Sequence, residues 1–277
     1  MTQNTQSTIL VYNERPAAIG SLLPALRDSF ANRAIDLKLT DLSDIKLQLQ
    51  QPLTAFVLPG IIGTDSPYPD QLTPDIVKTL HDKIENGMVG IFICAGAAFL
   101  SRETRYDPPW GPPKRRSQLQ HIFNGLAKGP VNHLAKMPDD DIGGITLAPV
   151  TYNLPDGTPR KASIYYGNGT YFLPDDENDP NTKVIARLDT VEGKPPAIVR
   201  VQKGKGFAYF MAVHPEIGPV ALSKDTTVKD QKGLRKLTKA LSKHESGRKE
   251  LWGMIMDDII NHRSAMAQAA YRNSPKI

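Results

Sequence analysis

A single cysteine follows a short apolar run and precedes a series of small residues. The apolar run is Val89–Ile93, the cysteine is Cys94, and Ala95, Gly96 and two further alanines come next. A reactive residue on a sharp turn between a buried strand and a helix is typical of a nucleophile elbow, and small neighbours let the strained turn close without clashes. The start of the following helix favours the thiolate form. Cys94 is therefore a candidate nucleophile, and an inert buried cysteine is the alternative.

A histidine and a glutamate follow a second apolar run far along the chain. His214, Pro215 and Glu216 come directly after residues 207–213, which we expect to form a strand. His214 would act as the base for Cys94, and Glu216 would orient the imidazole ring and stabilise its protonated form. By itself, a His-Pro-Glu tripeptide also fits an ordinary loop. Combined with the elbow, it predicts a nucleophile, a base and an orienting carboxylate.

A glycine-containing turn follows a third apolar run, residues 55–58. The turn covers residues 58–65 and includes Gly60, Ile61 and Gly63. Because such a turn can aim a backbone N–H at a developing oxyanion, we expect Gly60 and Ile61 to supply one donor and Ala95 the other. The alternative is an ordinary strand-to-helix loop that uses glycine for a positive φ angle.

The elements that must hold these residues alternate between strand and helix in the N-terminal part of the chain. Apolar runs at 8–12, 35–39, 55–58 and 89–93 predict strands. Apolar stripes with helical spacing predict helices over 17–30 and from Pro74 to Asn86, with Thr73 as the N-cap. This order predicts an α/β fold with a mostly parallel central sheet and helices on both faces. Ligands of such sheets bind outside the carboxyl ends of the strands.

The C-terminal part of the chain predicts an added antiparallel region. We expect strands at 145–150, 162–166, 184–188, 197–201 and 207–213, and helices at 234–243 and 249–262. The proline-rich stretch 107–116 excludes regular helix and central strand, and we expect an exposed loop or lid there. We expect one domain over 1–277, composed of a sheet core (1–106), a proline-rich insert (107–142), strands ending in His-Pro-Glu (143–220) and basic C-terminal helices (221–277).

Composition excludes several classes of protein. The chain has 277 residues, of which 40% are hydrophobic, so it can form a packed core and is not disordered throughout. Its one cysteine excludes an internal disulfide framework and a multi-cysteine metal site. No apolar run is long enough to span a bilayer, and the polar N-terminus does not resemble a secretion signal. We therefore expect a cytoplasmic protein.

Charge and histidine spacing give weaker indications. The formal net charge is +5, and the excess of basic residues lies in 221–277. A solvated helical face explains this excess. Because no aromatic residues lie among the basic residues of 232–243, we do not expect nucleic-acid binding. The histidines outside the predicted site show no metal-ligand spacing, so we expect no metal and no cofactor. They are His81, His121, His133, His244 and His262.

The motifs together resemble those of the class I glutamine amidotransferase superfamily. The nearer resemblance is to the amidotransferase-like domain at the N-terminus of eukaryotic biotin–protein ligases, which also occurs as a stand-alone bacterial protein. The similarity covers most of the chain. The segments that carry it are 9–13, 58–60, 65–68, 93–97, 129–130, 165–169, 204–206 and 213–216.

The resemblance implies a Rossmann-like, flavodoxin-type sheet and a reaction of glutamine or a glutamyl amide. It implies Cys94 as nucleophile, His214 as base and Glu216 as orienter. It does not imply biotin ligation, because the sequence contains no biotinyl-adenylate loop. The family's double-glycine turn is replaced here by Gly60, Ile61, Ile62 and Gly63. The positions that the resemblance marks as substrate-binding are Asp65, Tyr68, Gly96 and, by comparison with one branch of the superfamily, Glu14.

Two classes of function therefore remain open. The first is a cysteine hydrolase that cleaves an amide or acyl bond of a small molecule or peptide through a thioester. The second is an inactive binding or regulatory module that contacts a protein partner through 107–116 or the basic C-terminus. A reactive thiol and amide turnover that depends on Cys94 favour the first class, and a sluggish thiol without turnover favours the second.

Overall fold

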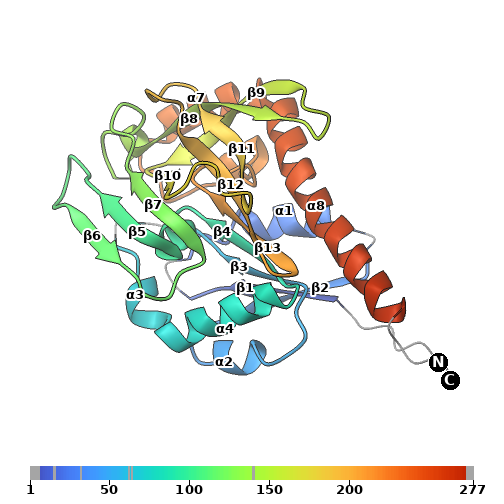
Figure 1. The fold of residues 1–277 in the computed structure, drawn as a ribbon. Helices are drawn as coiled ribbons and strands as arrows, with labels where there is room; N and C mark the ends of the chain where they lie inside the picture. Colours follow the sequence, from blue (N-terminus) through green and yellow to red (C-terminus); the bar gives the residue numbers. More distant parts are fainter. Residues whose placement is uncertain are drawn as a thin grey trace.

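The computed structural model describes residues 7–14, 17–31, 33–61, 63, 65–138 and 141–272. Within these residues, nine strands form one large sheet (Figure 1). Their order across it is β2 (Ile35–Thr40), β1 (Ser7–Tyr12), β3 (Ala55–Leu58), β4 (Val89–Ile93), β13 (Gly206–Met211), β12 (Pro196–Lys203), β11 (Thr182–Leu188), β8 (Ile145–Asn153) and β9 (Pro159–Gly167).

The large sheet has a parallel half and an antiparallel half. The pairs from β2 through β1, β3 and β4 to β13 are parallel. The pairs from β13 through β12, β11 and β8 to β9 are antiparallel. This arrangement confirms the predicted α/β class, with a mostly parallel centre and an added antiparallel region. The predicted strands at 8–12, 35–39, 55–58 and 89–93 are all present.

Helices cover both faces of the parallel half. Alternate residues of β1 point to opposite faces, so Ile9 packs in the core that includes α1 (Leu22–Ser29) and α8 (Glu245–Arg272). Leu10 packs in the core that includes α2 (Ile45–Gln48), α3 (Tyr68–Gln71) and α4 (Pro74–Glu85). Burial on both faces explains why the central strands are continuously apolar.

A second sheet of four strands packs against the large one. Its order is β10 (Tyr171–Pro174), β7 (Phe123–Gly129), β5 (Ser101–Tyr106) and β6 (Lys114–Ser117). The ring centroids of Phe123 and Phe172 lie 5.5 and 6.2 Å from that of Phe210 on β13. The small sheet follows directly on α5 (Ala95–Phe99), so it is built beside the elbow (Figure 1).

Several features differ from the sequence predictions. The helix expected over 17–30 begins only at Leu22, because Ala17 pairs with Ile61 and the Ala18 N–H donates to the Gly60 carbonyl. The stretch 107–116 is not wholly a loop, since residues 114–116 belong to edge strand β6. The last helix extends beyond 262, as far as Arg272. Strands β5 and β7 were not expected.

The remaining helices lie in the C-terminal part of the chain. They are a 3-10 turn (Ile142–Gly144), α6 (Pro219–Leu222) and α7 (Gln231–Ser242). The Asp230 carboxylate accepts from the Lys232 and Gly233 N–H groups and so caps α7. Among the residues that the structure describes, no helix has the length and apolar character needed to cross a membrane. That residues 1–277 form one domain stays a prediction.

Candidate active site

Cys94 occupies a strained turn between β4 and α5. Its backbone angles are φ 50° and ψ −112°, which a residue with a side chain rarely adopts. The Cys94 N–H donates to the Met211 carbonyl at 2.7 Å, which ties the turn to β13. A Cβ on Gly96 would overlap the Leu58 carbonyl oxygen and come within 2.8 Å of the Pro59 oxygen. The small residue at 96 therefore lets α5 pack against the end of β3.

His214 and Glu216 lie on the turn that follows β13. The His214 N–H donates to the Tyr165 carbonyl at 2.9 Å. The His214 and Tyr165 rings pack edge to face, with their centroids 5.5 Å apart. His214 Nδ1 and Glu216 Oε1 are 2.7 Å apart, and both side chains are buried. The guanidinium of Arg248 on α8 donates to the Pro215 carbonyl between them. The turn is thus held by a strand on one side and a helix on the other.

The cysteine and the histidine meet beside Gly60. A Cβ built on Gly60 would lie 3.2 Å from His214 Cε1 and 3.3 Å from Cys94 Cβ. Both side chains therefore lie beside Gly60, and the Cys94 Sγ is 3.9 Å from the Gly167 carbonyl oxygen. Strand β13 pairs with β4 so that Met211 lies opposite Ile93, which brings the turns after both strands to one edge of the sheet.

The electrostatics of the histidine favour its charged form. Burial by itself would lower the pKa of His214, but the charge of Glu216 and the hydrogen bonds with Cys94 and Glu216 raise this pKa to about 10. With Nδ1 engaged by Glu216, the Nε2 atom is the one available to exchange a proton with the thiol. His214 is therefore held as an imidazolium near neutral pH.

Two cavities open on either side of this pair. One, of about 230 Å³, is lined by Cys94, the 167–170 turn and the side chains of β6. The other is a groove of about 760 Å³ lined by His214, Glu216 and Trp252. Ile61 and Gly167 line both. The thiol faces the smaller cavity, which has room for a small molecule.

Of the three residues expected to supply N–H donors to an oxyanion, Ile61 and Ala95 line the smaller cavity. Ala95 is the first residue of α5, where an N–H has no partner within the helix. Ile61 lines the cavity with Ala95, and Gly60 packs against Cys94. In the described part of the chain, no acceptor is paired with the N–H of Gly60, Ile61 or Ala95. Among the described residues, no acceptor therefore competes with a ligand oxygen for these donors.

The four positions marked as substrate-binding have different surroundings. Asp65 lines the smaller cavity and forms an ion pair with Lys114. Tyr68 is fully buried, and its hydroxyl donates to the Pro59 carbonyl at 2.8 Å. Gly96 is enclosed under the elbow. Glu14 accepts from the Leu42 N–H at 3.3 Å in the loop after β1, and it lines neither cavity.

Three polar residues of the smaller cavity were not singled out as site residues from the sequence. They are Arg116 on β6 and Asn168 and Thr170 on the turn after β9. The Tyr166 hydroxyl donates to the Gly169 carbonyl at 2.6 Å and holds this turn in place. An Asn-Gly pair such as Asn168-Gly169 is typical of a turn, and Asn168 has a positive φ of 54°. Nothing local indicated that the turn faces the cysteine.

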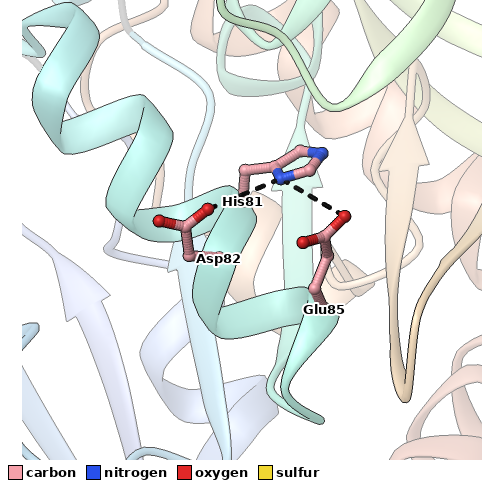
Figure 2. Close-up of side chains that lie close together, drawn as sticks. All are labelled: His81, Asp82 and Glu85. Carbon is pink, nitrogen blue, oxygen red and sulfur yellow. Dashed lines mark ion pairs between the residues drawn. The ribbon is translucent and has the colours of Figure 1, made fainter.

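One cluster elsewhere has residue types that bind metals. In the described residues, His81, Asp82 and Glu85 are the one such group, and they lie on α4 (Figure 2). His81 Nδ1 lies 3.8 Å from Glu85 Oε1 and 4.0 Å from Asp82 Oδ1. Asp82 also pairs with Lys78 at 2.6 Å. Ordinary ion pairs on an exposed helix face account for this cluster.

Comparisons with known proteins agree with this fold. Residues 9–274 match the family model described as "Biotin-protein ligase, N terminal". The biotin–protein ligase of Schizosaccharomyces pombe is 28% identical over 221 residues, which are 75% of this chain and 33% of the ligase. An uncharacterised protein of Chlamydia muridarum is 23% identical over 208 residues, 74% of this chain and 76% of that protein. The chain thus spans about a third of the yeast ligase.

Solved structures of two amidotransferases share the architecture. A glutamine amidotransferase from Thermotoga maritima superposes with a TM-score of 0.55 at 14% identity, over 92% of this chain and 98% of that one. A glutamine amidotransferase from Methylobacillus flagellatus gives a TM-score of 0.54 at 10% identity, over 93% and 95%. At these identities the likeness establishes an amidotransferase-like fold.

Proposed function

Since the chain belongs to the family of biotin–protein ligase N-terminal domains, whose fold here is that of the glutamine amidotransferases, we propose that it is a cysteine hydrolase of amide bonds. Cys94 is the nucleophile, His214 the acid and base, and Glu216 the orienting carboxylate. The substrate is a small-molecule or peptide amide, of the glutamine or glutamyl class. The proposal does not include biotin ligation.

The first half of the reaction forms a thioester. The Cys94 thiolate attacks the amide carbonyl carbon, and the electron pair of the C=O bond moves onto oxygen. When the tetrahedral intermediate collapses, the C–N bond breaks and the His214 imidazolium gives its proton to the leaving nitrogen. An amine or ammonia departs, and the acyl group remains on sulfur.

The second half hydrolyses the thioester. The now neutral His214 takes a proton from water, which attacks the acyl carbon; the C–S bond breaks, and the thiolate and imidazolium are restored with release of a carboxylic acid. In both halves the backbone N–H groups of Ala95 and of Gly60 or Ile61 bind the oxyanion. Removing one such donor typically slows catalysis by about 100- to 1000-fold.

One observation carries the proposal. A cysteine in a strained elbow, open to a cavity, meets an imidazole that a buried carboxylate holds at 2.7 Å. Strain of about 1–3 kcal/mol at a residue with positive φ persists only where the surrounding structure enforces it. An inert core cysteine would have no need of this conformation, of a charged neighbour or of an opening.

The test measures ammonia release and thiol reactivity. Ammonia from L-glutamine and from peptide-bound glutamine amide is measured for the wild type, Cys94→Ser and His214→Gln, with His244→Gln, an exposed histidine outside the site, as matched control. Because Cys94 is the only cysteine, the rate of iodoacetamide labelling near neutral pH reports on it alone. We expect labelling faster than that of free cysteine and turnover that both site variants abolish.

The second candidate is a binding or regulatory module that keeps the pocket without catalysis. The stretch 107–116 or the basic C-terminus would then contact a protein partner. This candidate predicts labelling no faster than that of free cysteine and no turnover of either amide. That result would replace the hydrolase proposal.

A further inference from the structure

Three consecutive basic residues of β6 line the cavity that contains the thiol. Two of them have carboxylate partners. Lys114 pairs with Asp65, whose side chain is largely exposed. Arg115 pairs with Asp107 through both oxygens, with Nη2 and Oδ2 2.8 Å apart. The charges of these two residues are therefore balanced.

The third basic residue, Arg116, has no carboxylate partner among the described residues. Its guanidinium lies over the Phe99 ring at 4.7 Å, and Nη2 donates to the Phe99 carbonyl at 3.2 Å. The Nε atom is buried and has no hydrogen-bond acceptor. Burial lowers the pKa of Arg116 to about 10. A desolvated cation without a counter-ion is costly, so a missing anion would complete this site.

The facing wall holds two buried polar atoms that also lack partners. Asn168 and Thr170 are 7% and 3% exposed, and both line the cavity. Their Oδ1 and Oγ1 atoms have no hydrogen-bond partner, although the Asn168 Nδ2 donates to the Met137 carbonyl at 3.0 Å. Because buried polar atoms are normally paired, these oxygens are suited to accept N–H groups from a ligand. The walls of one cavity thus contain a cation, two buried acceptors and a thiol.

We propose that this cavity selects amides that also carry a carboxylate, with Arg116 binding the carboxylate and the Asn168–Thr170 turn accepting the substrate N–H groups. This inference rests on the proposed function and narrows its substrate class. Arg116 contacts the carbonyls of Ala98 and Phe99, one turn of α5 from Cys94. One helical turn is about 5–6 Å long, which matches a short half-amide such as glutaramate.

The first test uses two maleimides of similar size that alkylate Cys94. 3-Maleimidopropionate carries a carboxylate, and N-propylmaleimide is neutral. In both, the thiolate adds to the C=C bond and the neighbouring carbon takes a proton from water. The readout is the ratio of the two rate constants, compared with that of N-acetylcysteine. Because Arg116→Gln removes the charged donor to the carboxylate, we expect it to lower the wild-type ratio about tenfold or more.

Arg115→Gln is the matched control. It removes the same charge from the same strand, and we expect it to change the ratio much less, because Asp107 already balances Arg115. An equal fall in both variants would mean a general electrostatic field and would overturn the proposal. So would a wild-type ratio no higher than that of N-acetylcysteine. Circular dichroism verifies folding.

A second test uses the wild-type chain and does not depend on a variant that folds. Glutaramate is expected to protect Cys94 against N-propylmaleimide at lower concentration than pentanamide, its analogue without the carboxylate. Equal protection, or none by either compound, would contradict the carboxylate site. Neither readout needs turnover, so a failure of the hydrolase proposal and a failure of the carboxylate site can be told apart. Equal turnover of glutaramate and pentanamide would reject it while keeping the hydrolase.

Discussion

Replacing Glu216 with glutamine separates the charge of this residue from its shape. Glutamine keeps the side-chain length and an oxygen that accepts from His214 Nδ1, but it removes the negative charge that lies 2.7 Å away. That charge is the main factor that raises the pKa of His214. Without it, the lowering of this pKa by burial would no longer be offset by Glu216. We expect the pKa of His214 in Glu216→Gln to fall to the ordinary value of about 6.5 or below.

The magnitude follows from the protonated fraction of His214. With a pKa of about 10, the ring is almost fully protonated at pH 7. With a pKa of about 6.5, roughly a quarter of the molecules carry the imidazolium at pH 7. Because the imidazolium stabilises the thiolate, we expect iodoacetamide labelling of Cys94 at pH 7 to slow by about fourfold or more in Glu216→Gln.

The assay is the rate of labelling between pH 5 and pH 10, with the adduct identified by mass spectrometry. The wild type should stay reactive toward acidic pH, whereas Glu216→Gln should gain reactivity only as an ordinary thiol does, near pH 8–9. Glu177→Gln, an exposed carboxylate far from the site in sequence, is the control. A Glu216→Gln profile that superposes on the wild-type profile would refute the ion-pair reasoning.

Three other predictions concern stability and packing. Because the pKa of His214 is raised in the folded state, its stabilising contribution is complete below about pH 6.5 and is lost up to about pH 10, which urea denaturation at several pH values measures. Gly60→Ala should slow Cys94 labelling while the melting temperature stays nearly unchanged, since the new methyl presses on both site side chains. Gly96→Ala should destabilise the fold by about 2 kcal/mol or more, because its methyl would overlap the Leu58 carbonyl. Gly253→Ala, in open space on α8, should stabilise the fold by about 0.5–1 kcal/mol. Equal urea midpoints for these two variants would contradict both expectations.

The elbow was predictable because its requirements are local. A buried strand, one reactive residue and small neighbours are all consecutive in the sequence, and the structure has them at β4, Cys94 and α5. The meeting with His214 was expected only as a consequence of strand order. It depends on the pairing of β13 with β4, which lie more than 100 residues apart in the sequence. No local pattern encodes that pairing.

The second sheet escaped prediction for a physical reason. Strand β5 reads Ser-Arg-Glu-Thr-Arg-Tyr, and its alternating charges are satisfied by ion pairs such as that of Arg102 with Asp175 at 2.7 Å. Hydrophobic periodicity therefore does not reveal it. For the same reason the sequence did not indicate a site role for Arg116, which follows several prolines and was expected to lie in a loop. The helix expected over 17–30 was too long because pairing with Ile61 takes precedence over helical propensity at residues 17–18.

Helix α8 connects the end of the sheet that holds Cys94 and His214 with the opposite end, where β4 begins. Arg248 holds the Pro215 carbonyl, Trp252 donates to Ser29 on α1 at 2.9 Å, and His262 contacts the Gly87 carbonyl at 3.0 Å. During synthesis on the ribosome, Cys94 emerges long before Arg248 does. The nascent chain therefore contains Cys94 before Arg248 can hold the turn of His214, and premature termination ahead of residue 248 would give a product that has the cysteine but lacks this contact.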